Sequence, residues 1–251
     1  MNKKIGIAAL ALWLGAGCVN PRSVVLGQTP RMMSQGEVEV GIATGVAWDS
    51  FSDGQGNSAS ATVQLPAAEA NIAYGLSDGL DLNLHASTAG LQPGVKIKLP
   101  TAGMLEMALM PSLAGGLYVG RTYSTVNGSS SSTPINAWTV LGGVKFLASI
   151  PAGLYGGVGY DFQYFRYRFD QDGGGSVNDG SGLTSHHVNI NLGWELKVGM
   201  MRVRPEFAFS FSPFVYQHQP EGSTNSPEPM NELMVMPNVT IAFAAPTGGG
   251  N

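Results

Sequence analysis

One stretch of the chain alternates polar and apolar residues without a break: residues 187–198, His-Val-Asn-Ile-Asn-Leu-Gly-Trp-Glu-Leu-Lys-Val. Successive side chains of a β-strand point to opposite faces, so this stretch predicts a strand with one apolar face and one polar face. The apolar face carries Val188, Ile190, Leu192, Trp194, Leu196 and Val198. The following segment repeats the pattern, because the apolar residues from Met201 to Phe211 alternate with Arg202, Arg204 and Glu206.

Working outward from this stretch, the same period of two predicts ten strands along the chain. They lie at about residues 36–48, 62–76, 80–88, 90–99, 104–120, 136–150, 153–169, 183–198, 200–214 and 232–244. We therefore expect an all-β fold, an antiparallel up-and-down β-barrel of about ten strands. Eight strands is the alternative, if the short third and fourth segments pair differently.

The connections between these segments alternate in length. Residues 49–61, 121–134, 170–182 and 215–231 are long and rich in Gly, Ser, Asn, Asp and Pro, a composition that belongs in water. Residues 77–79, 100–103 and 151–152 and Gly199 form short turns, and the connection near Ala89 is short where the pattern requires a long one. Long loops on one side and tight turns on the other are typical of outer-membrane barrels.

The N-terminus predicts an export signal. Lys3 and Lys4 precede an apolar stretch at residues 5–14, which is too short to span a bilayer as a helix. Residues 14–18, Leu-Gly-Ala-Gly-Cys, resemble the lipobox of bacterial lipoproteins, which implies that Cys18 is lipidated. Leu14 lies four residues before the cysteine, where that family has it three before, and ordinary signal cleavage is the alternative.

These observations divide the chain into four parts. We expect a signal peptide at 1–17, a periplasmic segment at 18–35, the barrel at 36–244 and a flexible tail at 245–251. An even number of strands would place both ends of the barrel on the periplasmic side.

Composition excludes several classes of protein. Charged residues make up 12% of the chain, which argues against a disordered protein, and the net charge of −4 offers no basic footprint for nucleic acid. Cys18 is the single cysteine, which excludes a disulfide framework and a cysteine-based metal cluster. We expect no metal and no cofactor.

A resemblance supports a membrane location. Residues 71–84, Asn-Ile-Ala-Tyr-Gly-Leu-Ser-Asp-Gly-Leu-Asp-Leu-Asn-Leu, and residues 94–99 resemble the strand–turn–strand repeats of small Gram-negative outer-membrane barrels. The resemblance covers most of residues 36–244 and concerns the architecture shared by that superfamily. It implies outer-membrane lipids and the barrel-assembly machinery as partners.

Aromatic residues near the strand ends are typical of such barrels, which carry aromatic girdles at both membrane interfaces. The predicted girdle is Trp48, Tyr74, Trp138, Trp194 and Phe243. The alternative is a soluble barrel or sandwich, which would bury the apolar face and expose the charges to water.

The polar face predicts a charged lumen. Seven acids and six bases fall on it: Glu37, Glu39, Glu69, Asp81, Glu106, Glu195 and Glu206, with Lys96, Lys98, Lys145, Lys197, Arg202 and Arg204. Balanced charges in a narrow interior should pair, because an unpaired buried charge costs several kcal/mol. We therefore expect an ion-pair network near the periplasmic strand ends that plugs the barrel. A narrow channel for small solutes is the alternative.

Enzymatic function lacks a matching motif. Ser185 adjoins His186 and His187, but neighbours on a strand point to opposite faces, so Ser185 and His186 should not meet. The chain also departs from the ten-stranded outer-membrane proteases, because its acids lie away from the extracellular rim except for loop residues such as Asp170 and Asp172. We expect a non-enzymatic protein, structural or surface-interacting, with a possible ligand at the long extracellular loops. An outer-membrane hydrolase is the third hypothesis.

Overall fold

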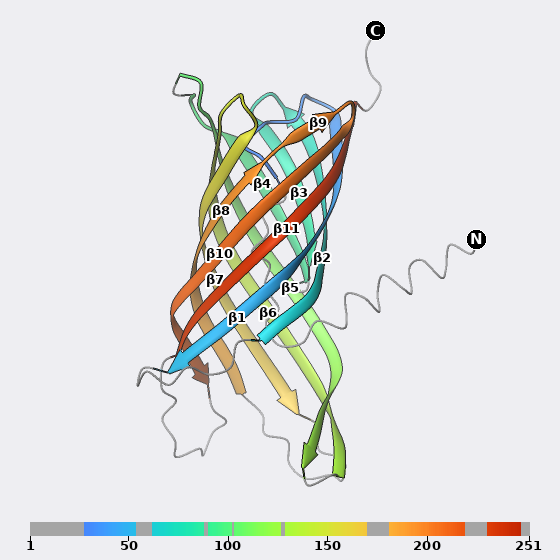
Figure 1. Ribbon diagram of the computed structural model, residues 1–251, viewed down its shortest axis with the longest axis vertical. Coiled ribbons are helices and arrows are strands. Elements are labelled where there is room, and N and C mark those ends of the chain that lie inside the picture. The colour runs from blue at the N-terminus through green and yellow to red at the C-terminus, as the bar shows by residue number, and fades with distance from the viewer. Residues whose placement is uncertain are drawn as a thin grey trace, which may run out of the picture.

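The computed structural model describes residues 28–53, 62–87, 90–101, 103–126, 129–169, 181–218 and 230–246. These residues form a closed antiparallel β-barrel (Figure 1). Its strands are β1 (Glu37–Asp53), β2 (Thr62–Ser77), β3 (Leu80–Ser87), β4 (Gly90–Lys98), β5 (Glu106–Val126), β6 (Ser129–Ser149), β7 (Leu154–Phe169), β8 (Ser181–Trp194), β9 (Leu196–Val198), β10 (Met201–His218) and β11 (Met230–Pro246).

Neighbouring strands in the sequence are neighbours in the sheet, and β11 closes the barrel by pairing with both β1 and β10. β8 and β9 form one wall segment interrupted at Glu195, since both pair with β10. The prediction of an up-and-down barrel of ten strands is therefore confirmed. The eight-stranded alternative is wrong, because β3 and β4 pair with each other and with β2 and β5.

The two ends of the barrel differ. The short connections after Ser77, Ser149 and Val198 all lie at the end that is uppermost in Figure 1, here called the turn end. Gly153 (φ 89°) and Gly199 (φ 61°) shape two of these turns in a backbone region that favours glycine. The first residue of β1 also pairs with the last residue of β11, so both ends of the barrel wall lie here. The opposite end is called the loop end.

One predicted loop is wrong. Residues 121–134 were expected as a long polar connection, but β5 and β6 remain paired through this region, from Arg121 opposite Pro134 to Val126 opposite Ser129. Serine and threonine accept extended backbone when the partner strand supplies the hydrogen bonds, so polarity alone does not predict a loop. The other predicted long loops lie mostly at residues 54–61, 170–180 and 219–229, outside the described residues, as do the predicted signal peptide with Cys18 and residues 247–251 of the predicted tail.

The barrel carries its apolar residues outside and its polar residues inside. On β8, Ile190 and Leu192 are 52% and 56% exposed, whereas Asn189 and Asn191 between them are 1% and 4% exposed. The predicted aromatic residues also lie exposed on the outer wall: Trp48, Tyr74, Trp138, Trp194 and Phe243. This arrangement excludes the alternative of a barrel or sandwich that buries its apolar face.

Among the described residues, no helix is long and apolar enough to span a membrane.

The barrel wall is lowest at β3 and β4. These strands have 8 and 9 residues, whereas β5 and β6 have 21 each. On one side, β2 pairs with β3 only from Ala70 onward, although it begins at Thr62. On the other side, the pairing of β5 with β4 ends at Gly115, although β5 continues to Val126.

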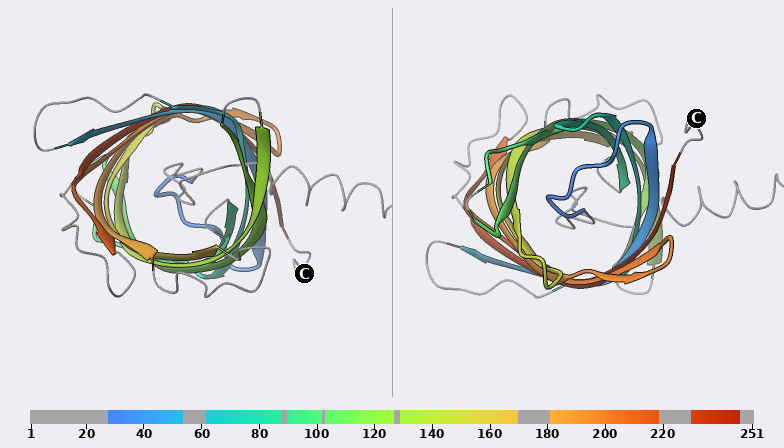
Figure 2. Two further views of the ribbon diagram at one scale, coloured as in Figure 1. Left: turned by 90° about the horizontal axis from the view of Figure 1, so that it is seen from below. Right: turned by 90° about the horizontal axis from the view of Figure 1, so that it is seen from above.

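The segment before β1 lies inside the barrel (Figure 2). Gln28, Thr29 and Met33 are all buried there. Gly36 N–H donates to the Gly75 carbonyl at 2.8 Å, which fixes the point where the chain passes from the lumen into the wall. Residues 18–35 are predicted as a periplasmic N-terminal segment. The structure places residues 28–36, here called the lumen segment, within the turn end of the barrel, where Lys96 and Asp81 bind its backbone.

Candidate functional site

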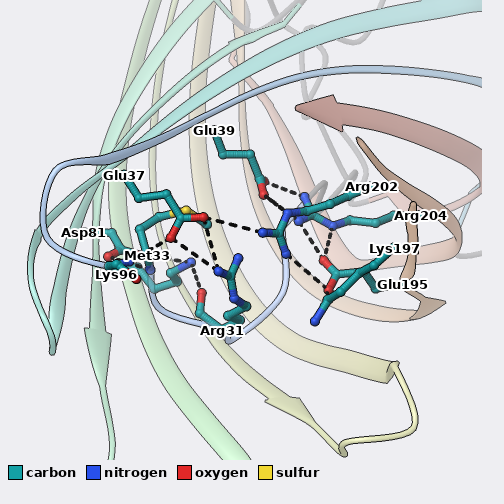
Figure 3. A network of polar contacts seen from close by, with 11 residues as sticks. Arg31, Met33, Glu37, Glu39, Asp81, Lys96, Glu195, Lys197, Arg202 and Arg204 are labelled. Carbon is teal, nitrogen blue, oxygen red and sulfur yellow. Dashed lines mark hydrogen bonds and ion pairs between the residues drawn. The ribbon is translucent and has the colours of Figure 1, made fainter. Parts of the chain in front are cut away.

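Arg204 lies at the centre of an ionic cluster on the turn-end lumen wall (Figure 3). Its guanidinium binds Glu39 through both terminal nitrogens, at 2.7 and 2.8 Å, and Glu195 at 2.7 and 2.8 Å. Arg204 is on β10, Glu39 is on β1, and Glu195 separates β8 from β9, so the cluster spans β8 to β1. Arg204 is 1% exposed and its charge is balanced by two carboxylates, as a buried cation requires.

Arg202 extends this cluster toward the turn end. It contacts Glu39 at 3.1 Å, Glu37 at 3.5 Å and Glu195 at 3.6 Å. Lys197 adds a contact to Glu195 at 3.1 Å, but its side chain is 57% exposed. The inner part of the cluster is therefore buried, and its edge faces solvent at the turn end.

A second ion pair binds the lumen segment. Lys96 and Asp81 are 3.0 Å apart and buried on β4 and β3. The Lys96 ammonium also donates to the backbone carbonyls of Thr29 at 3.3 Å and Arg31 at 2.7 Å. Asp81 accepts from Met33 N–H at 3.2 Å. The Lys96–Asp81 pair thus binds two backbone carbonyls and one backbone N–H of the lumen segment.

Arg31 links the lumen segment to the Arg204 cluster. Its guanidinium contacts Glu37 at 3.2 Å, and Glu37 also accepts from Ser34 N–H at 2.9 Å and from Arg202 at 3.5 Å. The lumen segment is therefore bound by Lys96 of β4, by Asp81 of β3 and by Glu37 at the start of β1 (Figure 3).

Two of the predicted acids, Glu206 and Glu69, bind phenol, amide or imidazole groups in place of lysine or arginine. Glu206 accepts from Tyr155 at 3.1 Å and from the side-chain amides of Asn191 at 2.9 Å and Asn238 at 3.5 Å. Glu69 lies 2.8 Å from His85. The sequence analysis counted charges only, so it missed these amide, phenol and imidazole partners.

Three predicted network residues lie apart from the ionic cluster. Lys98 and Glu106 are exposed at the turn end, where they line a recess of about 630 Å³ beside the lumen segment. Lys145 is buried in the lumen wall on β6, opposite Gly159 of β7.

The histidine pair on β8 divides between the two faces of the wall. His186 points outward, where its Nδ1 lies 2.5 Å from the Tyr160 hydroxyl and its ring packs against Phe162. His187 points into the lumen, and its Nε2 lies 2.6 Å from the Ser185 hydroxyl. Ser185 and His186 are predicted to point to opposite faces, and a separation of two residues places Ser185 and His187 on one face. The strand period already contained the signal for this pair.

The described residues contain no group of three or more His, Cys, Asp or Glu side chains placed to hold a metal ion. Asp161 lies opposite His187 across β7 and β8, and its carboxylate accepts from the Asn189 amide. The Arg204 cluster, the Lys96–Asp81 pair and the lumen segment thus lie together at the turn end of the lumen.

No family model matches the sequence, and no curated protein matches it. Solved structures with a similar fold include the outer membrane protease OmpT from Escherichia coli (9% identity, TM-score 0.46, 86% of this chain and 100% of that one). The translocator domain of the autotransporter NalP from Neisseria meningitidis has 8% identity and a TM-score of 0.46, with 96% and 94% of the two chains covered. An outer membrane channel from Pseudomonas putida F1 has 9% identity and a TM-score of 0.41, with 91% and 100% covered. At these identities the likeness concerns the β-barrel fold alone.

Proposed function

We propose that this chain is an integral outer-membrane β-barrel protein with a closed lumen, which serves as a non-enzymatic scaffold for surface loops. The inverted distribution of residues supports the membrane location. Ile190, Leu192, Phe207 and Phe209 lie exposed on the outer wall, as do many other large apolar side chains. Contiguous apolar surface of this kind is rare on proteins surrounded by water and is the usual outer face of a barrel in lipid.

Closure of the sheet supports the same location. A strand edge in hydrocarbon would leave backbone N–H and C=O groups without partners, so only closed sheets are stable there. Here β11 pairs with β1 over most of its length and with β10 on its other side. The exposed aromatic residues lie toward both ends, with Trp48 and Trp138 nearer the loop end and Trp194 and Phe243 at the turn end.

The observation that carries the closed lumen is the position of the lumen segment. Its backbone is bound by Lys96 and Asp81, and the Arg204 cluster occupies the wall on the other side. The cluster also combines both signs of charge, whereas a selective pore would favour one sign. We therefore expect no stable conduction of small ions.

Single-channel recording in planar bilayers tests this proposal. Insertion is first verified in the same preparation by gel mobility with and without boiling, because folded barrels in detergent migrate differently until heated. The proposal predicts a folded, inserted protein without stable open steps. Stable conductance would contradict closure and support the second candidate, a narrow channel for small solutes.

One observation favours that second candidate. Side-chain atoms of Asn83, Ser210 and Thr240 are buried on the lumen wall and, within the described part of the chain, have no hydrogen-bond partner. Buried polar atoms of this kind are usually satisfied by ordered water. Water on the loop-end side of the lumen segment would make a polar path that only the turn end closes.

Burial argues against the hydrolase hypothesis. Ser185 is 4% exposed and His187 is 0% exposed, so the bond to be cleaved in a substrate could not reach the Ser185 hydroxyl. A nucleophilic serine needs an activating base and also access to the substrate. Hydrolytic activity of the wild type that is lost in His187→Ala would contradict the non-enzymatic function.

Export and orientation complete the proposal. We propose that residues 1–17 are a signal peptide, that Cys18 is lipidated, and that the turn end with both ends of the barrel wall faces the periplasm. The barrel-assembly machinery would insert the chain, and a ligand would bind at the loop end outside the cell. Metabolic labelling with a radioactive fatty acid tests the lipid, since Cys18→Ser should lose the acyl label.

A further inference from the structure

An apolar groove of about 680 Å³ lies on the outer wall over β3, β4 and β5. Its sides are formed by Leu82, Leu84, Pro93, Pro111 and Leu113, with Tyr74 at the edge nearest the turn end. The groove also reaches Asn83 and Ser112, which belong to the lumen-facing set, and Ser112 accepts from the buried Gln92 amide at 2.8 Å. It therefore penetrates deeper into the wall than the outer side chains.

The groove follows the joint between β4 and β5, where the ladder has few residue pairs. Four residue pairs connect β4 to β5, whereas eight connect β3 to β4 and 21 connect β5 to β6. Gly94 pairs with Ser112, so Pro93 and Pro111 are the next residues along the joint on their respective strands. Proline has no backbone N–H, so each of these residues removes a donor from the ladder.

Small residues deepen the same joint. Gly90 has a φ of 99° and lies so close to β5 that an added Cβ would meet the Gly116 Cα at 2.7 Å. Gly115 of β5 lies on the outer face and adds no side chain there. On the outer wall, Pro93 and Pro111 thus stand where β8 and β10 carry larger apolar side chains such as Leu192 and Phe207, and a groove remains beside them.

We propose that this groove binds one acyl chain of a membrane lipid along the β4–β5 joint. The inference rests on the proposed membrane location and adds a specific site to it. None of the lining residues is charged, and the groove is open along the outer face of the wall. The groove is also continuous with the exposed apolar face, since Leu82 and Leu84 belong to both.

The polar end of the lipid would lie beside Tyr74. Tyrosine favours the membrane interface, where its ring is apolar and its hydroxyl is wet. Tyr74 pairs with Leu82 close to the turn after Ser77, whereas Pro93 and Leu113 lie farther from the turn end. The acyl chain would therefore run from the turn-end interface toward the low part of the wall.

Native mass spectrometry with dioleoylphosphatidylethanolamine as the probe tests this site. The protein is freed of lipid in detergent, the probe is added, and collisional activation is raised until loosely bound copies are removed. We expect one copy to remain on the wild type. Leu113→Trp fills the groove and should lower the population of this one-lipid species roughly tenfold or more.

The matched control is Leu192→Trp, because Leu192 and Leu113 are 56% and 59% exposed but only Leu113 lines the groove. This control should retain the lipid. Leu84→Trp is the second groove variant, used if Leu113→Trp does not show the heat-dependent mobility of a folded barrel. A wild type without a retained copy, a groove variant that binds like the wild type, or equal loss in the control would each overturn the site. Failure of the wild-type protein to insert into bilayers would instead overturn the membrane location.

Discussion

The two faces of β8 and β10 contain similar numbers of residues but follow opposite rules. On the inner face, Arg204 is 1% exposed, and its guanidinium is paired with the carboxylates of Glu195 and Glu39. On the outer face, Leu192 and Phe209 are exposed and contact no second layer of protein. The difference indicates that ion pairs and hydrogen bonds stabilise the inner face, whereas contact with the surrounding medium stabilises the outer face. Substitutions on the two faces should therefore fail for different reasons.

The largest effect should come from Arg204→Ala. This change leaves the buried carboxylates of Glu39 and Glu195 without their main partner, which typically costs about 3–5 kcal/mol. Urea unfolding in lipid vesicles, followed by tryptophan fluorescence, measures the loss. A cost below about 1 kcal/mol would contradict the role of Arg204 as the centre of the cluster.

Leu192→Arg should come next, because it places a charge on the lipid-facing wall. Arginine on a lipid-facing barrel wall costs up to about 2–4 kcal/mol, with the cost increasing from the interface toward the midplane. The adjacent control, Asn191→Gln, faces the lumen and keeps an amide near Glu206, so its cost should stay within about 1 kcal/mol. Equal costs for the two variants, measured by the same unfolding assay, would remove the distinction between the faces.

A smaller effect should follow from the double change Lys96→Met and Asp81→Asn. Removing both charges leaves no unpaired ion, so the cost is that of the backbone groups of the lumen segment, about 1–3 kcal/mol. A cysteine placed at Met33, in a Cys18→Ser background, should then react faster with a thiol reagent. Unchanged labelling would mean that this pair does not hold the segment.

The smallest effect should come from Lys197→Ala. Lys197 contacts Glu195 at 3.1 Å, but its side chain is 57% exposed, and exposed ion pairs contribute about 0.2–1 kcal/mol. Its unfolding midpoint should be nearly that of the wild type and should move little with added salt. A loss of unfolding free energy as large as that of Arg204→Ala would show that the exposure of an ion pair does not determine its contribution to stability.

The strands were predictable because their signal is periodic. Residues 187–198 alternate so regularly that both faces of β8 follow from the sequence, and the even number of strands follows from similar segments. The hairpin at residues 121–134 could not be predicted, because polar strands held by backbone pairing lack an apolar face. A strand without a continuous apolar face has an amino-acid composition like that of a loop, so the two cannot be told apart from sequence.

The candidate site was only partly predictable. Arg202, Arg204, Glu39 and Glu195 fall on one face by period two, but their pairing depends on the register between strands and on closure at β11. The lumen segment carries no periodic pattern, so residues 28–36 could not be placed inside the barrel from sequence. The β4–β5 joint was likewise hidden, because Pro93 and Pro111 flank the Gly94–Ser112 pair only once the two strands are aligned.

The central claim is that the outer face of the barrel contacts acyl chains. Tryptophan quenching by phospholipids brominated at defined depths tests it directly, with Ile190→Trp as a probe in the middle of β8 and the native Trp194 nearer the turn end. Each probe is measured in a variant whose other tryptophans are replaced by phenylalanine. We expect deeply placed bromine to quench the Ile190→Trp probe most strongly and shallow bromine to quench Trp194 most strongly. A monomer that stays in plain buffer without detergent, with neither tryptophan quenched at any depth, would contradict it.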